Sequence, residues 1–252
     1  MDYKVSIIIA TYNAGCTLTR CLEHIRAQKT KEIELLIMDG ESSDNTLTIV
    51  DQFNDIVDVC VSEPDKGIYD AWNKAVVRAK GDWMMFLGAD DYLEDGALSF
   101  YLNLLSERDC SSYDLICGKA KLFNEKGKVV RYIGIPYRWE SFRKQMLLSH
   151  GSSLHNKNLF KEVGLFDIKY NICGDYEFLL RKKLNSLFVD RVIICMQYGG
   201  VSSSFKSVWQ TFQVRKHRHS TSLFFNLFYF CKGIGAVVRN IIHISTKIYN
   251  FA

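Results

Sequence analysis

The chain has 252 residues, of which 48% are hydrophobic and 24% are charged. This length and composition indicate a folded protein with a substantial core, and they exclude an intrinsically disordered chain. Its eight cysteines form no CxxC pair and no zinc-like spacing. The first residues lead into a strand-like segment without a signal-peptide pattern. We therefore expect a cytoplasmic protein with reduced thiols.

The net charge of +4 is unevenly distributed along the chain. Residues 1–190 contain 24 basic and 28 acidic residues, a balance of −4, whereas residues 191–252 contain eight basic residues and no acidic residue. We therefore expect an acidic body and a basic, aromatic-rich tail. Such a tail favours a negatively charged surface as its partner.

Short apolar runs alternate with amphipathic segments in the first half of the chain. Buried strands are expected at residues 5–10, 34–38, 57–61 and 83–87, and helices at residues 18–25, 47–53 and 68–79. This alternation predicts a parallel sheet with right-handed crossovers.

The pattern changes after residue 113. Residues 114–133 indicate paired strands with a hairpin turn at residues 124–127. We therefore expect an α/β domain over residues 1–204, divided into halves at residues 1–113 and 114–204. Basic amphipathic helices are expected over residues 205–252.

Polar or acidic residues follow all four strands of the predicted parallel sheet. They lie at residues 11–13, 39–40, 63–67 and 88–91. Ligands of open α/β sheets bind beyond the carboxyl ends of the strands. Four such ends in succession therefore predict a ligand site at this edge.

Asp90 and Asp91 are adjacent carboxylates behind a very apolar strand. They repel each other unless a cation or hydrogen-bond donors lie between them, and Mg2+ or Mn2+ shared with substrate phosphates would meet that need. The alternative is that the pair only caps the following helix.

Four segments resemble, in order and spacing, the motifs of glycosyltransferase family 2. They are residues 6–13 (SIIIATYN), 36–46 (LIMDGESSDNT), 62–74 (SEPDKGIYDAWNK) and 81–91 (GDWMMFLGADD). The similarity extends over about residues 4–200 and is greatest to the bacterial O-antigen and capsule branch.

The resemblance implies a GT-A fold, with a Rossmann-like nucleotide-binding half, a mixed sheet and an acceptor half. It implies a metal-dependent, inverting hexosyltransferase with a UDP-hexose or UDP-N-acetylhexosamine donor. The residues that it places at the nucleotide sugar are Thr11, Asn13, Asp39, Asp65, Lys66, Gly67 and Asp90.

Within this set, the resemblance implies that Asp39 contacts the base, where a carboxylate can accept the imide N–H of uracil. Asp90 would face the ribose or the metal, and Asp91 would bind the ion. The family often has Asp-x-Asp-Asp here, whereas this chain has Gly88 at the first position. The number of protein ligands to the metal therefore stays open.

Asp175 matches the position of the family's catalytic carboxylate. It lies at the start of a predicted helix in which apolar residues recur with helical spacing. A carboxylate there can accept the proton of an attacking acceptor hydroxyl. The alternative is a helix cap without a catalytic role. Glu177 is expected to be a solvated first-turn residue that complements the helix dipole.

His150 resembles a histidine that the family often has before its acceptor-side strand. It is expected either to contact a phosphate or an acceptor hydroxyl, or to be a hydrogen-bonded core histidine.

Basic residues interrupt the apolar segments of the tail, and its longest uncharged apolar stretch is shorter than the roughly 20 residues of a spanning helix. A basic amphipathic helix suits an anionic membrane surface, which predicts peripheral association with the inner face of the cell membrane. The acceptor expected there is a lipid-diphosphate-linked saccharide of O-antigen or capsule synthesis. The alternatives are a tail packed on its own domain and a dimer contact.

Competing functions fit the sequence less well. A nucleotidyltransferase would need a basic phosphate loop at the first strand, and a dinucleotide oxidoreductase would need GxGxxG there; neither pattern occurs. A non-catalytic sugar-binding scaffold would be expected to lose Asp91 or Asp175, and both are present. We expect no nucleic-acid partner.

Overall fold

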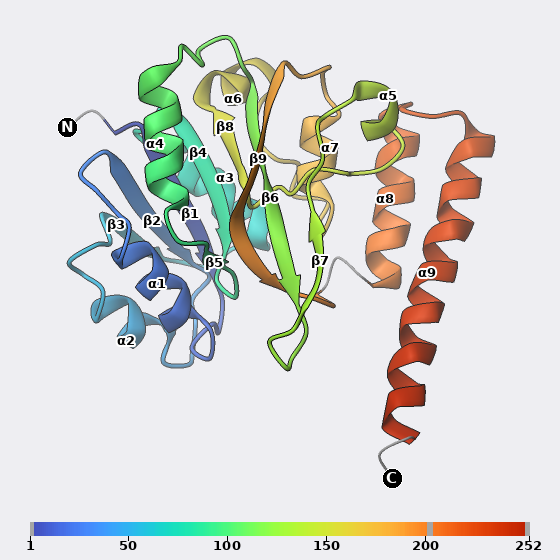
Figure 1. The fold of residues 1–252 in the computed structure, drawn as a ribbon, viewed down its shortest axis with the longest axis horizontal. Coiled ribbons are helices and arrows are strands. Elements are labelled where there is room, and N and C mark those ends of the chain that lie inside the picture. Colours follow the sequence, from blue (N-terminus) through green and yellow to red (C-terminus); the bar gives the residue numbers. More distant parts are fainter. Residues whose placement is uncertain (1–2, 201–203, 250–252) are drawn as a thin grey trace.

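The computed structural model describes residues 3–200 and 204–249. Within them, a mixed sheet of nine strands has helices packed on both faces (Figure 1). The strand order is β3-β2-β1-β4-β8-β6-β9-β5, and β7 pairs with β6. The mixed α/β architecture that the sequence predicts is confirmed.

The first half contains the four expected parallel strands and their crossover helices. The elements are β1 (Val5–Thr11), α1 (Leu18–Arg26), β2 (Ile33–Asp39), α2 (Thr46–Asp51), β3 (Val59–Ser62), α3 (Ile68–Arg78) and β4 (Trp83–Gly88). Apolar residues on one helical stripe face the core, as predicted for α1 from Leu18, Cys21, Leu22 and Ile25.

The register of the parallel strands aligns their carboxyl ends. Thr11 pairs with Asp39, Asp39 with Ser62, and Ala10 with Gly88. The loops that follow these strands therefore leave the sheet at one common edge, where the sequence predicts the ligand site.

The second half continues the same sheet. Its elements are β5 (Tyr92–Leu93), α4 (Ala97–Glu107), β6 (Leu115–Phe123), β7 (Val129–Ile133), α5 (Trp139–Phe142), β8 (Ser153–Asn156), α6 (Lys157–Val163), α7 (Gly174–Leu179) and β9 (Ser186–Gln197). β8 lies between β4 and β6 and is antiparallel to both, so it joins the two halves. The expected hairpin connects β6 to β7, and Gly127 adopts the positive φ of 73° that its turn requires.

Alternating side chains of the strands divide the core into two layers. Ile7 and Ile9 of β1 pack into the layer that includes α1, α2 and α4, whereas Ile8 packs into the layer that includes α3 and α7. This alternation reflects the period of two along a strand. The sheet is thus covered on both faces and presents its ends to ligands.

Two helices follow the sheet. α8 (Phe205–His217) packs against α7, and α9 (Leu223–Tyr249) packs against α8 and extends beyond the body (Figure 1). Across residues 3–200 and 204–249, no helix is long and apolar enough to cross a membrane.

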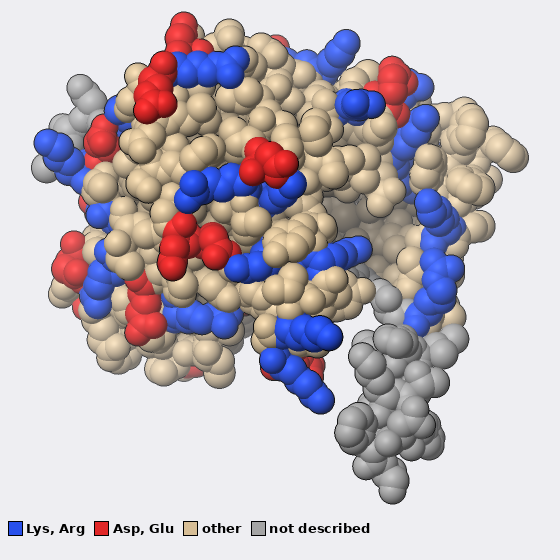
Figure 2. Space-filling model, in the orientation of Figure 1, with Lys and Arg blue, Asp and Glu red and all other residues tan. Residues whose placement is uncertain are grey.

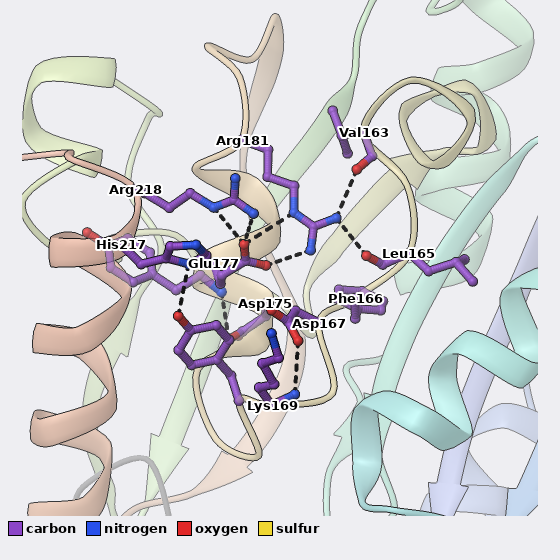
Figure 3. Close-up of polar contacts among 12 residues, drawn as sticks. Val163, Leu165, Phe166, Asp167, Lys169, Asp175, Glu177, Arg181, His217 and Arg218 are labelled. Atoms are coloured by element: carbon purple, nitrogen blue, oxygen red, sulfur yellow. Dashed lines mark hydrogen bonds and ion pairs between the residues drawn. The ribbon is translucent and has the colours of Figure 1, made fainter.

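Glu177 corrects an expectation from the sequence. Its side chain is fully buried rather than solvated. Arg181, one helical turn later, donates to Oε2 at 2.6 Å, and Arg218, just after α8, donates through Nε to Oε1 at 2.6 Å (Figure 3). Its sequence position suggested a helix-dipole role, but the distant Arg218 supplies a partner that makes burial of the charge tolerable.

We predict that Glu177→Gln destabilises the fold. The amide removes the negative charge that Arg181 and Arg218 share, and breaking a buried pair costs about 3 kcal/mol or more. Urea unfolding would measure the loss. The control is Glu162→Gln, since Glu162 is 58% exposed and pairs with Lys182 at the surface; that change should cost less than about 1 kcal/mol. Equal unfolding midpoints for the two variants would contradict the assignment.

Candidate active site

Asp39 is the most heavily hydrogen-bonded carboxylate at the sheet edge. Only 2% of its surface is exposed. Its Oδ1 accepts from Thr11 Oγ1 at 2.9 Å and Ser42 Oγ at 2.5 Å, and its Oδ2 accepts from Ser42 N at 2.9 Å and Ser62 Oγ at 2.7 Å. Burial alone would raise the pKa of Asp39, but these hydrogen bonds outweigh burial and lower it. The carboxylate therefore stays ionised.

Asn13 belongs to the same group of contacts. It adopts a positive φ of 49°, and its backbone N–H donates to Ser42 Oγ at 2.8 Å. Its Oδ1 accepts from Ser43 N at 2.9 Å. Thr11, Asn13 and Asp39 are thus brought together, as predicted, and they fix the loop after β2.

Gly40 lets two side chains close over the end of β2. A Cβ on Gly40 would lie 2.5 Å from Asp65 Oδ2 and 3.5 Å from Tyr12 Cδ2. The Tyr12 ring is 69% exposed. The edge therefore offers an exposed aromatic ring beside Gly40 and Asp65, at a position of the first motif that the sequence alone does not single out.

The loop that contains Asp65, Lys66 and Gly67 is held by its own backbone. Asp65 Oδ1 accepts from Gly67 N at 2.7 Å, and Gly67 takes a φ of 112° immediately before α3. Lys74 of α3 donates to the Pro64 carbonyl at 2.7 Å. The exposed Lys66 is thereby displayed at the rim of the edge.

Asp90 and Asp91 follow β4, and their carboxylates converge on Gly88. A Cβ at Gly88 would lie 2.8 Å from Asp90 Oδ1 and 2.9 Å from Asp91 Oδ2. The glycine at the first position of the acidic motif therefore leaves room for both side chains. Asp90 is exposed, whereas Asp91 is 6% exposed.

The electrostatics at Asp91 fit a bound cation. Burial and the neighbouring charge of Asp90 raise its pKa well above the ordinary value, and Arg20 opposes that rise only in part. Within residues 3–200 and 204–249, no hydrogen bond to either carboxylate is found, and no group of three or more His, Cys, Asp or Glu residues could hold a metal. The two aspartates could therefore supply only some of the ligands of a metal ion. Oxygens of the substrate would complete its coordination shell, an arrangement that is common for Mg2+.

Asp175 lies in α7 against a residue from the first half of the chain. Gly174 packs on the Tyr69 ring, because a Cβ there would lie 2.9 Å from two ring carbons. The Tyr69 hydroxyl lies 2.8 Å from the Ile172 carbonyl and 3.1 Å from Asp175 Oδ1. The third motif and the Asp175 segment, about 100 residues apart, thus form one unit.

The Asp175 carboxylate has the properties of a base. Burial raises its pKa to about 6, although Tyr176 N and the Tyr69 hydroxyl donate to Oδ1 and oppose the rise. The hydrogen bonds that other described residues donate to this carboxylate go to Oδ1 and not to Oδ2. Asp175 lines a cavity of about 360 Å³. An acceptor hydroxyl could enter there and lose its proton to Oδ2.

His150 lines the same cavity and packs within an aromatic cluster. Its ring stacks on Trp72 at 5.3 Å between centroids, and its buried Nε2 has no hydrogen-bond partner among the described residues. Burial lowers the pKa of His150 to about 3, so the imidazole is neutral. The sequence left open whether His150 is a core residue or contacts a ligand. The aromatic packing fits a core residue, and Nε2 is still available for a hydrogen bond to a ligand.

The acidic loop and the Asp175 cavity share the same edge of the sheet. Gly151 lines the cavity and lies close to β4. A Cβ at Gly151 would be 3.4 Å from the Phe86 carbonyl oxygen. β5 follows Asp91 directly and pairs with β9 at Cys195, next to the cavity residue Met196. The predicted donor and acceptor residues are therefore brought to one edge.

Tyr69 is a site residue that the sequence analysis missed. It lies in the third motif, but its partner Asp175 is over 100 residues away, and no local pattern reveals that contact. The motif spacing alone identifies the strand ends and not the residues that the fold brings to them.

Comparison with known proteins identifies the family. The family model described as Glycosyl transferase family 2 matches residues 6–174. A PGL/p-HBAD biosynthesis glycosyltransferase of Mycobacterium tuberculosis is 30% identical over 214 residues, which are 79% of each chain. The chain belongs to glycosyltransferase family 2.

Solved structures share the fold. TarS 1-349 of S. aureus in complex with UDP-GlcNAc superposes with a TM-score of 0.65 at 18% identity; the match covers 85% of this chain and spans 66% of that one. The mannosyltransferase PcManGT from Pyrobaculum calidifontis, in complex with GDP-Man and Mn2+, gives 0.63 at 13% identity and covers 96% and 76%. The expected GT-A fold is thereby confirmed.

We predict a pH dependence that reports on Asp175. With saturating Mg2+, kcat should fall as the pH decreases through about 6, because the carboxyl becomes protonated. Tyr69→Phe removes a hydrogen bond that lowers the pKa of Asp175. The acid limb of the pH–rate profile, which is the fall of kcat at low pH, should therefore move to higher pH. Tyr113→Phe, remote from the cavity, is the control. An acid limb that stays in place or moves down in Tyr69→Phe would contradict this electrostatic account.

Proposed function

We propose that the protein is an inverting, metal-dependent glycosyltransferase that transfers a sugar from a UDP-sugar to a hydroxyl of a lipid-diphosphate-linked saccharide in cell-surface polysaccharide synthesis. The observation that carries the proposal is the pair of unlike carboxylate sites at one sheet edge. Among the described residues, the buried Asp91 carboxyl accepts no hydrogen bond, and the partly buried Asp175 carboxyl lines a cavity and accepts hydrogen bonds from other residues only at Oδ1.

The donor is proposed to lie across the carboxyl ends of β1, β2 and β4. Its base would lie on the exposed Tyr12 ring, next to Asp39. The hydroxyls of Ser42 and Ser62 can rotate, so the ionised Asp39 can exchange one of those bonds for the imide N–H of uracil. Asp65, Lys66 and Gly67 would border the ribose and the diphosphate.

The acidic pair is proposed to hold Mg2+ or Mn2+ against the diphosphate. Such an ion would supply Lewis-acid stabilisation of the departing nucleotide. Asp91 would be the principal protein ligand, and the exposed Asp90 would contact the ion or the ribose. The mutual repulsion of the two carboxylates would then be relieved when the substrate complex forms.

Asp175 is proposed to be the general base. As the acceptor oxygen bonds to the anomeric carbon, its proton passes to Asp175 Oδ2, and the bond from that carbon to the diphosphate oxygen breaks with its electron pair. Attack from the face opposite the leaving group inverts the anomeric centre. His150, neutral and with Nε2 unpartnered, could bind an acceptor hydroxyl in the same cavity.

For the metal site, we predict that Asp91→Asn lowers transfer about 100-fold or more, because several kcal/mol of charge stabilisation are lost. The fold should not be weakened, since the variant removes a buried charge whose ionised form is disfavoured. Transfer assays and thermal unfolding would be compared with those of Asp95→Asn, an exposed aspartate nearby. Full wild-type activity in excess chelator would refute metal dependence.

For the base, we predict that Asp175→Asn keeps nucleotide-sugar binding but lowers turnover by about 10²–10⁴-fold, the usual contribution of general-base catalysis. The amide keeps the shape of the side chain and an oxygen acceptor for Tyr69. Calorimetric binding of UDP together with a transfer assay separates the two steps. Turnover close to that of the wild type would leave Asp175 as a helix cap and favour a different base.

The tail is proposed to bind an anionic membrane surface. Large apolar residues on α9 are exposed, among them Phe224 at 75% and Phe228 at 56%. Basic side chains accompany this helix without acidic neighbours (Figure 2). Among the basic residues of 205–252, Arg215 and Arg218 bind within the protein, so the attraction would rest mainly on the exposed Lys206, Lys216, Lys232 and Arg239.

We predict that the protein pellets with anionic vesicles at low salt and is released at high salt. Each exposed basic residue contributes about 1 kcal/mol near such a surface. Phe224→Asp with Phe228→Asp should weaken binding, because the apolar face can no longer enter the headgroup region. Val77→Asp is the control, as Val77 is 73% exposed on α3. If the wild type ignores anionic vesicles at low salt, a soluble acceptor becomes the better assignment.

A further inference from the structure

One face of α8 is turned towards the cavity that contains Asp175. Ser207, Gln210 and Val214 are buried on this face at helical spacing. Ser207 and Thr211 line the cavity together with Asp175 and His150. The C-terminal region, for which the sequence left open both a membrane-binding tail and packing on its own domain, therefore supplies a wall of the proposed acceptor site.

Gln210 holds the three residues that precede Gly174 and Asp175. Its Oε1 accepts from Ile172 N at 3.0 Å and from Cys173 N at 3.2 Å, and its Nε2 donates to Asn171 Oδ1. Gln210 is 7% exposed. These contacts fix the backbone that leads into α7, at a point where neither helix nor sheet would satisfy its N–H groups.

The same backbone joins Gln210 to the Asp175 hydrogen bond. The Ile172 carbonyl accepts from the Tyr69 hydroxyl, which also lies 3.1 Å from Asp175 Oδ1. A shift of residues 171–173 would therefore move both the start of α7 and the hydroxyl that orients the carboxylate.

A second contact holds α7 from its other side. Arg218, at the end of α8, donates to Glu177, two residues after Asp175 (Figure 3). Cys173 Sγ also lies 3.5 Å from the Ser207 carbonyl of α8. α8 thus contacts the Asp175 segment both before and after the carboxylate.

We propose that Gln210 is a positioning residue for Asp175 and that α8 is part of the active site. The inference rests on the proposed role of Asp175 as the base. A base displaced by about 1 Å loses on the order of 100-fold in rate. Because Asp175 acts only on the attacking hydroxyl, loss of Gln210 should affect kcat and leave the affinity for the nucleotide sugar unchanged.

The ionisable groups around Asp175 determine what the pH dependence of kcat can report about this carboxylate. The ionisable groups that face it are Tyr69 from α3, Cys173 and Tyr176 on its own segment, His150 before β8, and Arg215 from α8, which lies near Cys173. Gln210 makes no hydrogen bond to the ionisable group of any of them, since its contact with Cys173 is to the backbone N–H. A change of the acid limb would therefore report the environment of the carboxylate.

The test uses the full chain and compares Gln210→Leu with Gln213→Leu, an exposed glutamine of the same helix. In Gln210→Leu, kcat should fall roughly 10- to 100-fold with UDP affinity unchanged, and the acid limb should move below pH 6 as water reaches Asp175. Gln213→Leu should match the wild type. Wild-type kcat and pH profile in a folded Gln210→Leu would overturn the inference.

Gln210→Glu is the second variant, and it decides the matter if Gln210→Leu does not fold. It keeps the oxygen that accepts from Ile172 and Cys173 but brings a negative charge towards Asp175, so the acid limb should move upward. An unmoved limb would overturn the inference. The proposed function is tested separately, because wild-type turnover in Asp175→Asn would refute the base assignment whatever Gln210 does.

Discussion

The contact between Tyr69 and the Gly174–Asp175 segment is the interaction on which the active-site arrangement depends. The ring lies against a residue without a Cβ, and the hydroxyl reaches both the Ile172 carbonyl and the Asp175 carboxylate. This contact joins the half of the chain that carries the nucleotide motifs to the half that carries the cavity. Any side chain at position 174 would displace the ring and separate the proposed base from the donor edge.

The three carboxyls of the site show opposite outcomes of the same physical problem, the removal of a carboxylate from water. Asp39 is ionised because four hydrogen bonds outweigh its burial. At Asp91 and Asp175 the opposing interactions are weaker than desolvation, so the pKa of each is raised. The fold thus holds two carboxyl groups at the sheet edge whose ionised forms are disfavoured. A cation at Asp91 and the proton of an acceptor hydroxyl at Asp175 would stabilise them only when substrates are present.

Local patterns in the sequence predicted the elements and the strand ends, because buried strands and helical stripes have their own periods. The same reasoning was wrong for Glu177, whose partner Arg218 lies 41 residues away. For residues 205–252 the sequence left open a membrane-binding tail, a tail packed on its own domain and a dimer contact, since nothing near Gln210 in the sequence indicates its contacts with residues 171–173. Residues could be selected from the sequence where a family motif assigns them a role, whereas Tyr69 stands out only through its tertiary contact with residues 172–175.

A crystal structure with Mn2+ and a UDP-sugar tests most directly the claim that Asp91 and Asp175 serve one reaction. The account predicts the ion on Asp91 and the diphosphate, with the anomeric carbon facing the Asp175 cavity. An acceptor oxygen should then fit about 3 Å from Asp175 Oδ2 and in line with the leaving group. An ion bound away from Asp91, or a donor sugar directed away from Asp175, would contradict it.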